Sequence, residues 1–259
     1  MNTLPVFDTL QLEIEGGIAT LWLNRPDSRN ALNLRMCHEL TAACEILEAD
    51  ETVRVVVLRA RGTAFCAGAD LKERQGMSAA EMVARRVDGF TAYAALEALS
   101  KPLIAAVHGA VFGSGCEIAA ACDFVLATSQ AAFKYPEVGW GTVGATQRLP
   151  RIVGRRMAKE LLFSGRTVDA HEALQLGLVN HVYDPAEFDA AVAAMAERIA
   201  AANPLTVRLT KQSIDDGLDT TREGAMAIEL LAIQRNLRHS DWQKAISAFG
   251  KKEKGDAAA

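Results

Sequence analysis

The sequence predicts a mixed α/β fold, and three observations support that prediction. Apolar runs of strand length alternate with helix-like segments as far as Arg151. Such alternation is typical of parallel β-α units. After Arg151 only helical patterns are expected, apart from a short apolar piece at residues 179–182. Half of the 259 residues are hydrophobic, so the chain can bury a sizeable core.

Individual elements follow from local patterns. Alternating apolar and polar residues on either side of Gly16-Gly17 predict a β-hairpin, and Asn33 is placed to cap the helix that follows. Strands are expected at residues 10–14, 18–23, 53–58, 103–107, 124–127 and 132–135. Helices are expected at residues 33–48, 78–99, 118–121, 155–163, 169–176, 185–202, 204–216, 222–238 and 241–249.

The chain is expected to divide into two parts. Residues 1–195 would form the core with the functional site, and residues 196–259 a C-terminal helical region. The dipeptide Asn203-Pro204 interrupts the helical pattern close to that boundary. No internal repeat is visible in the sequence.

Composition excludes several classes of function. The formal net charge is −4 and the isoelectric point about 5.8, which argues against a nucleic-acid partner. Five cysteines without C-x-x-C spacing argue against a disulfide framework and a structural zinc site, so we expect no metal and a cytoplasmic location. The N-terminal residues lack the pattern of a signal peptide, and no apolar run is long enough to span a membrane.

Two glycine-containing turns are the first candidate functional elements. Residues 65–71 (FCAGADL) and 109–117 (GAVFGSGCE) each follow a strand-like run. Two backbone amides directed at one point can hold the negative charge that develops on a carbonyl oxygen. The alternative is that these glycines only make tight loops after strands. Asp70 is expected to anchor its turn through backbone hydrogen bonds.

A pair of glutamates is the second candidate element. Glu117 and Glu137 are too far apart to pair along one helix, so only the fold can bring them together. Two carboxyl groups in one dry pocket can divide acid and base roles, because burial and mutual repulsion separate their pKa values. Two alternatives stay open. Ser114 and Glu117 have the spacing of a helix capping box, and Glu137 is also compatible with an exposed loop.

Together these segments resemble the crotonase superfamily, also called the enoyl-CoA hydratase/isomerase family, over residues 17–252. The nearest branch is that of the enoyl-CoA and methylglutaconyl-CoA hydratases, which residues 158–164 resemble. The resemblance rests on residues 24–26 (NRP), 30–32 (NAL), 64–71 (AFCAGADL), 101–102 (KP), 109–117, 122–123 (CD), 136–137 (PE), 146–149 (TQRL) and 177–179 (GLV). It implies a crotonase-like spiral of repeated ββα units with a C-terminal helical trimerisation region.

The resemblance also implies roles for individual residues. Ala69 and Ser114 would donate the two oxyanion amides. Glu117 would orient and deprotonate water, and Glu137 would protonate the α-carbon. The residues implied at the CoA and acyl site are Arg29, Ala31, Ala67, Gly68, Asp70, Leu71, Phe112, Gly113, Pro136, Gly144, Phe249 and Lys252.

The partner implied is an acyl-CoA thioester, in which CoA is the substrate carrier and no cofactor is needed. A homo-oligomer is expected, either a trimer or a hexamer made of two trimers. Two departures from the family pattern stand out. Ser114 occupies a position where many members have glycine, and the glycine-rich run at residues 141–146 looks shorter than usual.

The expected activity is that of an enoyl-CoA hydratase, because the isomerases of the family usually keep only the second glutamate. The alternatives are an isomerase, hydrolase or decarboxylase built on the same oxyanion site. From another class of protein, the alternatives are a non-catalytic acyl-CoA-binding sensor or an RNA-binding relative.

Overall fold

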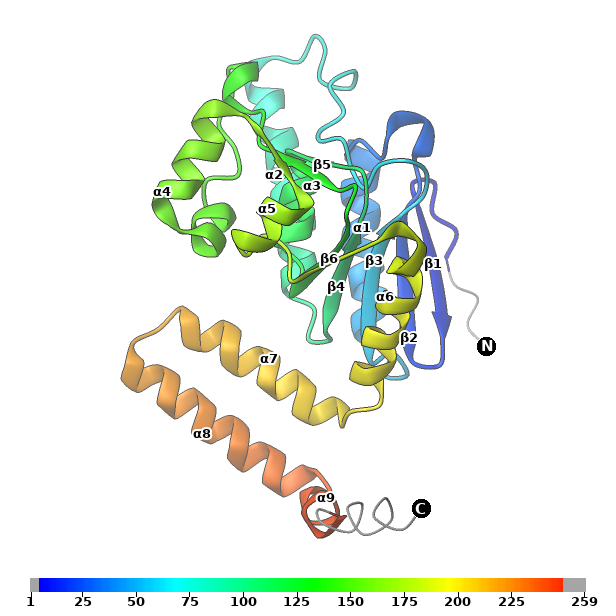
Figure 1. Cartoon of the computed structure of the whole chain (residues 1–259), viewed down its shortest axis with the longest axis vertical. Helices are drawn as coiled ribbons and strands as arrows, with labels where there is room; N and C mark the ends of the chain where they lie inside the picture. The colour runs from blue at the N-terminus through cyan, green and yellow to red at the C-terminus, as the bar shows by residue number, and fades with distance from the viewer. Residues whose placement is uncertain (1–4, 249–259) are drawn as a thin grey trace. The chain divides into compact units, whose positions relative to one another are not determined.

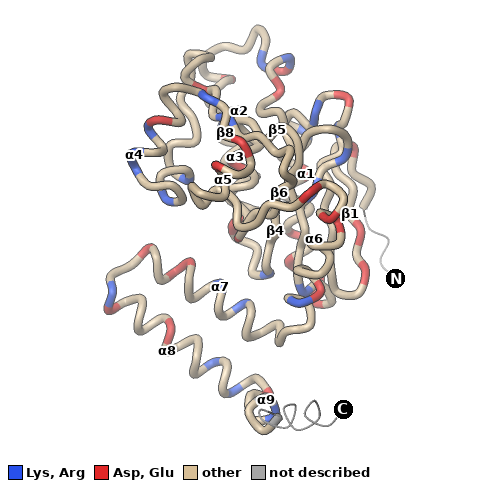
Figure 2. The backbone as a smooth tube through the Cα atoms, in the orientation of Figure 1, with Lys and Arg blue, Asp and Glu red and all other residues tan. Residues whose placement is uncertain are grey.

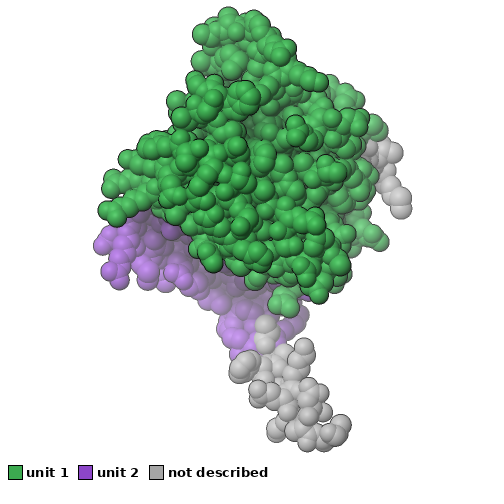
Figure 3. All heavy atoms as spheres, turned by 45° about the horizontal axis from the view of Figure 1, so that its top comes forward, with its two compact units in different colours: residues 1–199 green, residues 200–259 purple. Residues whose placement is uncertain are grey.

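The computed structural model describes residues 5–248, and Figure 1 shows the course of the chain. The chain forms two compact units, residues 1–199 and residues 200–259 (Figure 3). Helix α6 (Pro185–Ala200) runs across the boundary expected after residue 195, so that domain division stays a prediction. Acidic and basic residues are interspersed along the backbone of both units (Figure 2). Within residues 5–248, no helix has the length and apolar character needed to cross a membrane.

A six-stranded sheet forms the centre of the first unit. Its strand order is β1-β2-β3-β4-β6-β9, in which only the β1–β2 hairpin is antiparallel. Its strands are β1 (Leu10–Glu15), β2 (Ile18–Leu23), β3 (Val55–Ala60), β4 (Leu103–Val107), β6 (Phe124–Thr128) and β9 (His181–Tyr183). Every residue of β4 is buried, as expected for a parallel strand covered on both faces.

The helices largely follow the expected pattern. The side chain of Asn33 accepts a hydrogen bond from the Met36 amide at 2.9 Å, which confirms the predicted cap of α1. Besides α6, the described part of the first unit contains five α-helices: α1 (Leu34–Ala49), α2 (Ala79–Glu97), α3 (Ser114–Ala120), α4 (Arg148–Ser164) and α5 (Ala170–Gln175). Two of them begin earlier than predicted: α3 at Ser114, and α4 at Arg148 with a kink at Gly154.

A second, smaller sheet consists of strands of three residues each. Its order is β5 (Ala110–Phe112), β7 (Ala132–Lys134) and β8 (Thr167–Asp169). The sequence predicted neither β5 nor β8, and the expectation of only helices after Arg151, apart from one apolar piece, is wrong. A strand of three residues shows little of the alternation by which strands are recognised. β7 was predicted because it lies in a separate apolar run, whereas β5 lies inside a glycine turn and β8 ends where a helix was expected.

The first unit contains a structural repeat that the sequence does not show. Each repeat runs from a strand of the large sheet to a helix by way of an extended segment, which is a strand of the small sheet in two repeats and a bridge to that sheet at Cys66 in the first. The three repeats are β3–Cys66–α2, β4–β5–α3 and β6–β7–α4. The mixed α/β fold class is confirmed, and repeated ββα units place equivalent turns at one edge of the small sheet.

The second unit contains α7 (Pro204–Leu218), α8 (Arg222–His239) and α9 (Trp242–Ala248). Helices α7 and α8 pack against each other. No residue of α8 is buried, and five of its large apolar side chains are exposed: Met226, Leu230, Leu231, Ile233 and Leu237.

Asn30 fastens the loop before α1 to the rest of the first unit. It is fully buried and has a left-handed backbone with φ of 54°. Its side chain accepts from the Arg25 amide at 2.7 Å and donates to the carbonyl oxygens of Arg61 and Ala64 at 2.8 Å each. The amide group thereby ties two loops together.

Replacing Asn30 should therefore destabilise the fold. Asn30→Ala loses three buried hydrogen bonds worth roughly 1 kcal/mol each and places alanine in an unfavourable backbone region, so we expect a loss of roughly 2–4 kcal/mol in urea unfolding. Asn30→Gly loses the same bonds but tolerates the backbone, so its loss should be smaller. An alanine variant as stable as the wild type would contradict this account.

Candidate functional site

The small sheet aligns three turns at one edge. β5 pairs in parallel with β7, so that Val111 lies opposite Phe133, and Cys66 forms a parallel bridge with Val111 on the other side. The carboxyl ends of parallel strands meet at one edge of a sheet. The turns that leave this row of three segments carry Ala69, Ser114 and Glu137.

The two glycine turns touch each other. Gly68 has φ of 106° and Gly113 φ of 48°, a region that favours glycine. A Cβ atom at Gly68 would lie 3.3 Å from the carbonyl oxygen of Phe112. One at Gly113 would lie 3.9 Å from Cα of Gly68 and 3.1 Å from Oε1 of Glu137. Glycine therefore permits both the close approach of the turns and the placement of Glu137 against them.

The amides of Ala69 and Ser114 are both unused by the described chain. Leu32 donates to the Gly68 carbonyl at 2.8 Å and accepts from Asp70 at 3.0 Å, so the Ala69 N–H faces away from Leu32. Ser114 is the first residue of α3, where an N–H has no intrahelical acceptor. Neither N–H donates a hydrogen bond to any residue in 5–248.

The capping-box alternative for Ser114 is wrong. Gly113, not Ser114, is the N-cap of α3, and no side chain caps that helix. Ser114 does not have a positive φ; the residue before it, Gly113, does, with φ of 48°. Serine therefore fits this position without backbone strain.

Glu117 is buried and paired with an arginine. Its residue is 7% exposed, and Oε2 lies 3.1 Å from Nη1 of Arg148. Burial raises the pKa of the Glu117 carboxyl, Arg148 opposes that rise, and the negative charge of Glu137 raises the pKa further. Both glutamates lie close to Gly113, because the Glu117 amide donates to the Gly113 carbonyl at 3.1 Å and a Cβ at Gly113 would lie 3.1 Å from Oε1 of Glu137.

Arg148 is itself held in place by α2. Its Nε and Nη2 each lie 2.6 Å from an oxygen of Glu97, and its guanidinium carbon lies 5.4 Å from the centre of the Tyr93 ring. Glu97 and Tyr93 are one helical turn apart, so they share a face of α2. This two-point pairing fixes the guanidinium that faces Glu117.

Glu137 lies in a different environment. Its Oε2 is buried without a hydrogen-bond partner among the described residues. Burial raises the pKa of the Glu137 carboxyl, and the positive charge of Arg86 opposes that rise. A Cβ at Gly144 would lie 2.8 Å from Cγ of Glu137 and 3.0 Å from Nη1 of Arg86. The alternative of an exposed loop glutamate is therefore wrong.

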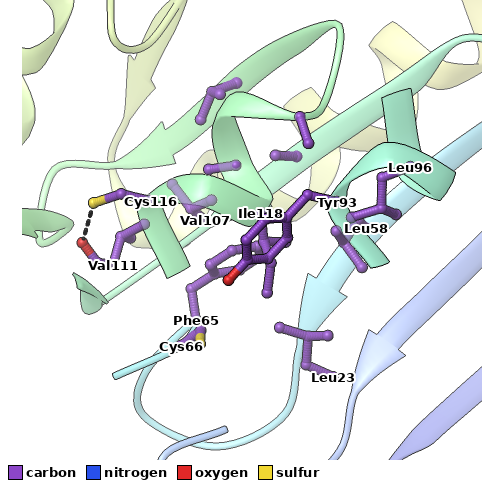
Figure 4. Close-up of a cluster of buried hydrophobic side chains, with 14 of the residues drawn as sticks. Leu23, Leu58, Phe65, Cys66, Tyr93, Leu96, Val107, Val111, Cys116 and Ile118 are labelled. Atoms are coloured by element: carbon purple, nitrogen blue, oxygen red, sulfur yellow. Dashed lines mark hydrogen bonds between the residues drawn. The ribbon is translucent and has the colours of Figure 1, made fainter. Parts of the chain in front are cut away.

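A cluster of buried hydrophobic side chains packs next to the residues of the site. Tyr93 belongs to the same cluster as Phe65, Cys66 and Ile118 (Figure 4). Burial raises the pKa of the Cys66 thiol to about 12, and the Cys116 thiol donates to the Val111 carbonyl at 2.8 Å. Both thiols stay protonated at neutral pH, so neither is available as a nucleophile.

Two of the segments expected to bind CoA, those of Arg29 and Ala67, are joined by a backbone hydrogen bond. The Arg29 carbonyl accepts from the Ala67 amide at 3.0 Å, which brings these two segments side by side. Asp70 anchors its turn as predicted, because it pairs with Arg25 at 3.0 Å and accepts from the Lys72 amide at 3.1 Å.

Other expected positions lie nearby or outside the structure. Ala31 accepts a hydrogen bond from the Arg25 guanidinium, and Leu71 is exposed beside Asp70. Pro136 lies beside Gly113, where a glycine Cβ would be 3.7 Å from Cδ of the proline. Phe249 and Lys252 lie outside the described residues, so their role stays a prediction.

Sequence reasoning missed four side chains around the glutamates: Arg86, Tyr93, Glu97 and Arg148. Three of them lie on one face of α2, at a spacing that follows the helical period. On a helix such residues are indistinguishable from an ordinary surface stripe. Arg148 stands in a motif that the resemblance used, but nothing in its spacing links it to Glu117.

The model of the "Enoyl-CoA hydratase/isomerase" family matches residues 13–257. The chain belongs to the enoyl-CoA hydratase/isomerase family. The chain is similar to a "Crotonyl-CoA hydratase" of Syntrophomonas wolfei, with 39% identity over 254 residues that cover 96% of this chain and 98% of the relative. A "Short-chain-enoyl-CoA hydratase" of Clostridium acetobutylicum is 40% identical over 247 residues and covers 94% and 95% of the two chains.

Solved structures of enoyl-CoA hydratases have the same fold. The enoyl-CoA hydratase of Bacillus anthracis superposes with a TM-score of 0.91 at 32% identity, over 95% of this chain and 97% of that one. The enzyme of Mycobacterium smegmatis gives 0.90 at 36% identity, over 94% and 96%. The predicted membership of the crotonase superfamily is confirmed.

The burial of Glu137 should cost the protein stability. The folded-state pKa of Glu137 lies above its unfolded-state value, so the stability contributed by the protonated form is lost as pH rises through the folded-state pKa. Glu137→Gln removes the charge, and we expect a gain of about 1 kcal/mol at about pH 8.

This gain should shrink as the pH falls toward the unfolded-state pKa of about 4.3. Urea unfolding at several pH values measures it, and Glu45→Gln at an exposed glutamate is the matched control. Equal effects of the two substitutions at every pH would contradict the burial argument.

Proposed function

We propose that this chain is an enoyl-CoA hydratase, which adds water across the double bond of an α,β-unsaturated acyl-CoA. One observation carries the proposal: two unused amides and two carboxyl groups gather around Gly113 at one edge of the small sheet. The Glu117 amide donates to the Gly113 carbonyl at 3.1 Å, and a Cβ at Gly113 would lie 3.1 Å from Oε1 of Glu137. The amides of Ala69 and Ser114 bind the thioester oxygen. They stabilise the negative charge on that oxygen when the enolate forms.

Glu117 is the base in this scheme. It accepts a proton from water as the water oxygen bonds to the β-carbon, and the electrons of the double bond move toward the thioester oxygen. A base must be ionised to act, and the adjacent Arg148 favours the carboxylate against the effect of burial.

Glu137 is the acid. Its unpaired, buried oxygen favours the protonated form, which can deliver a proton to the α-carbon as the enolate collapses. The proton gained by Glu117 must then be lost and one restored to Glu137 before the next turnover. The different surroundings of the two carboxyl groups support this division of roles.

Hydration rather than isomerisation is supported by the presence of both carboxyl groups, since moving a double bond needs no activated water. The names of the relatives agree with hydration. The scheme needs neither cofactor nor metal, and CoA enters only as the carrier of the acyl group. Arg29, Ala31 and Ala67 are proposed to line the path of CoA.

The proposal extends to assembly and location. The exposed apolar side chains of α8 support trimerisation, or hexamers of two trimers, through the C-terminal region. Phe249 and Lys252 would then complete the CoA site. The absence of a disulfide among the described cysteines supports a reducing compartment such as the cytoplasm, although the names of some relatives include the word mitochondrial.

The purified protein should hydrate crotonyl-CoA, which is followed by the loss of absorbance of the conjugated thioester. Glu117→Gln and Glu137→Gln should each reduce kcat by ~10²-fold or more, as expected for general acid–base groups. Glu45→Gln serves again as the control. Mass analysis of the product separates hydration, which adds one water, from isomerisation. A variant with the wild-type rate would remove that glutamate from the mechanism.

Arg148→Gln should change the pH dependence rather than only the rate. Without the arginine, the pKa of Glu117 rises further and the base is protonated over more of the acidic range. We expect kcat/KM to fall ~10-fold or more at about pH 6 and much less at about pH 9. Arg148→Lys keeps the charge and should retain a profile closer to that of the wild type. An equal loss at every pH would indicate a purely structural role.

A further inference from the structure

Three arginines gather beside the site, and only one of them is neutralised. Arg85 is buried, pairs with Glu73 at 2.8 Å and donates to the Leu32 carbonyl at 2.9 Å. Arg74 lies nearby in the segment before α2, and its Nε is buried without a hydrogen-bond partner. Among the described residues, Arg74 makes no ion pair. Arg74 is half-buried, and a guanidinium whose Nε is shielded from water without a partner costs free energy, so this arrangement favours an anion that the described chain does not supply.

Arg86 is the second unneutralised arginine. Its Nη2 donates to the Thr142 hydroxyl at 3.0 Å, and no carboxylate of the described residues lies within ion-pair distance of it. Arg86 lies across Gly144 from Glu137. The positive charges of Arg86 and Arg85 lower the pKa of Arg74, after the larger effect of burial, so the guanidinium groups repel one another.

We propose that Arg74 and Arg86 bind a carboxylate at the far end of the acyl chain, so that the preferred substrate is an enoyl-CoA with an anionic acyl group. This inference rests on the proposed function of the same site. It names the class of substrate that the described contacts favour.

The position of Arg86 places this anion on the acyl side rather than the CoA side. The thioester oxygen lies at the amides of Ala69 and Ser114, and the CoA path runs past Ala67 and Arg29. The acyl carbons must pass Glu137, which protonates the α-carbon. The next groups beyond Glu137 are Gly144, Thr142 and Arg86. A chain that carries a carboxylate a few bonds beyond the double bond would place it there.

The test compares three substrates that share the same CoA. Glutaconyl-CoA carries a terminal carboxylate, 5-methylhex-2-enoyl-CoA has a neutral isopropyl group of similar shape in its place, and crotonyl-CoA lacks both. For the wild type, kcat/KM should be at least ~10-fold higher with glutaconyl-CoA than with the neutral analogue, the effect of a charge-assisted hydrogen bond. Arg86→Gln and Arg74→Gln should each reduce that ratio ~10-fold or more.

The ratio is the readout because Arg86 also acts on Glu137, so all rates with Arg86→Gln will change. Arg156→Gln, at an exposed arginine of α4, is the control and should leave the ratio unchanged. Thermal unfolding checks that each variant is folded. A ratio that is the same in the wild type and both variants would overturn the proposal. An equal rise of KM for all three substrates would also overturn it, because the arginines would then serve the CoA phosphates.

A binding experiment separates this inference from the proposed function. Calorimetry compares glutaryl-CoA with 5-methylhexanoyl-CoA, neither of which can be hydrated. Tighter binding of glutaryl-CoA that is lost in Arg86→Gln supports the anion site even if no substrate is turned over, in which case only the hydratase proposal fails. Equal binding of the two ligands contradicts the anion site whatever the activity.

Discussion

The parallel register of the small sheet is the constraint on which the site depends. Val111 is opposite both Phe133 and Cys66, so the turns that follow these residues leave the sheet at the same level. Each strand is short, and the register is secured beyond its ends. The Gly113 amide donates to the Lys134 carbonyl at 2.9 Å, and β8 pairs with the far side of β7. A slip by one residue would reverse the faces of β5 and separate the two amides.

Electrostatics then distinguishes two groups that are chemically identical. Glu117 is buried, whereas Glu137 is half-buried with its Oε2 shielded from solvent, and burial raises the pKa of both carboxyl groups. Arg148 lies 3.1 Å from one of them, whereas Arg86 approaches the other without an ion pair. A carboxyl group with a close cation and one with a buried, unpaired oxygen have different preferred protonation states. The same arrangement costs stability, because the site leaves donors and acceptors unsatisfied until a ligand supplies them.

Much of the fold was predictable from local sequence patterns. The β1–β2 hairpin, the Asn33 cap and the buried β4 strand depend on alternation, capping and apolar runs within a few residues. The positions of Ala69, Ser114 and both glutamates followed from glycine turns together with the family resemblance. The pairing of Arg148 with Glu117 was not predictable, because it depends on a contact between separate helices. β5 and β8 were missed because three residues carry little pattern and because β5 lies inside a glycine turn and β8 runs into a predicted helix, whereas the equally short β7 lies in a separate apolar run.

The repeated ββα unit explains why the site and its tuning residues come from different parts of the chain. The first repeat supplies Ala69, the second Ser114 and Glu117, and the third Glu137. Parallel strands joined by crossover helices bring these turns to one edge. The helices of the first and third repeats then return over the same edge with the side chains that adjust its charge. In the proposed mechanism the strand ends fix the positions of the Ala69 and Ser114 amides, and a face of α2 supplies charge. Substitutions on α2 can therefore change substrate preference without disturbing those two amides.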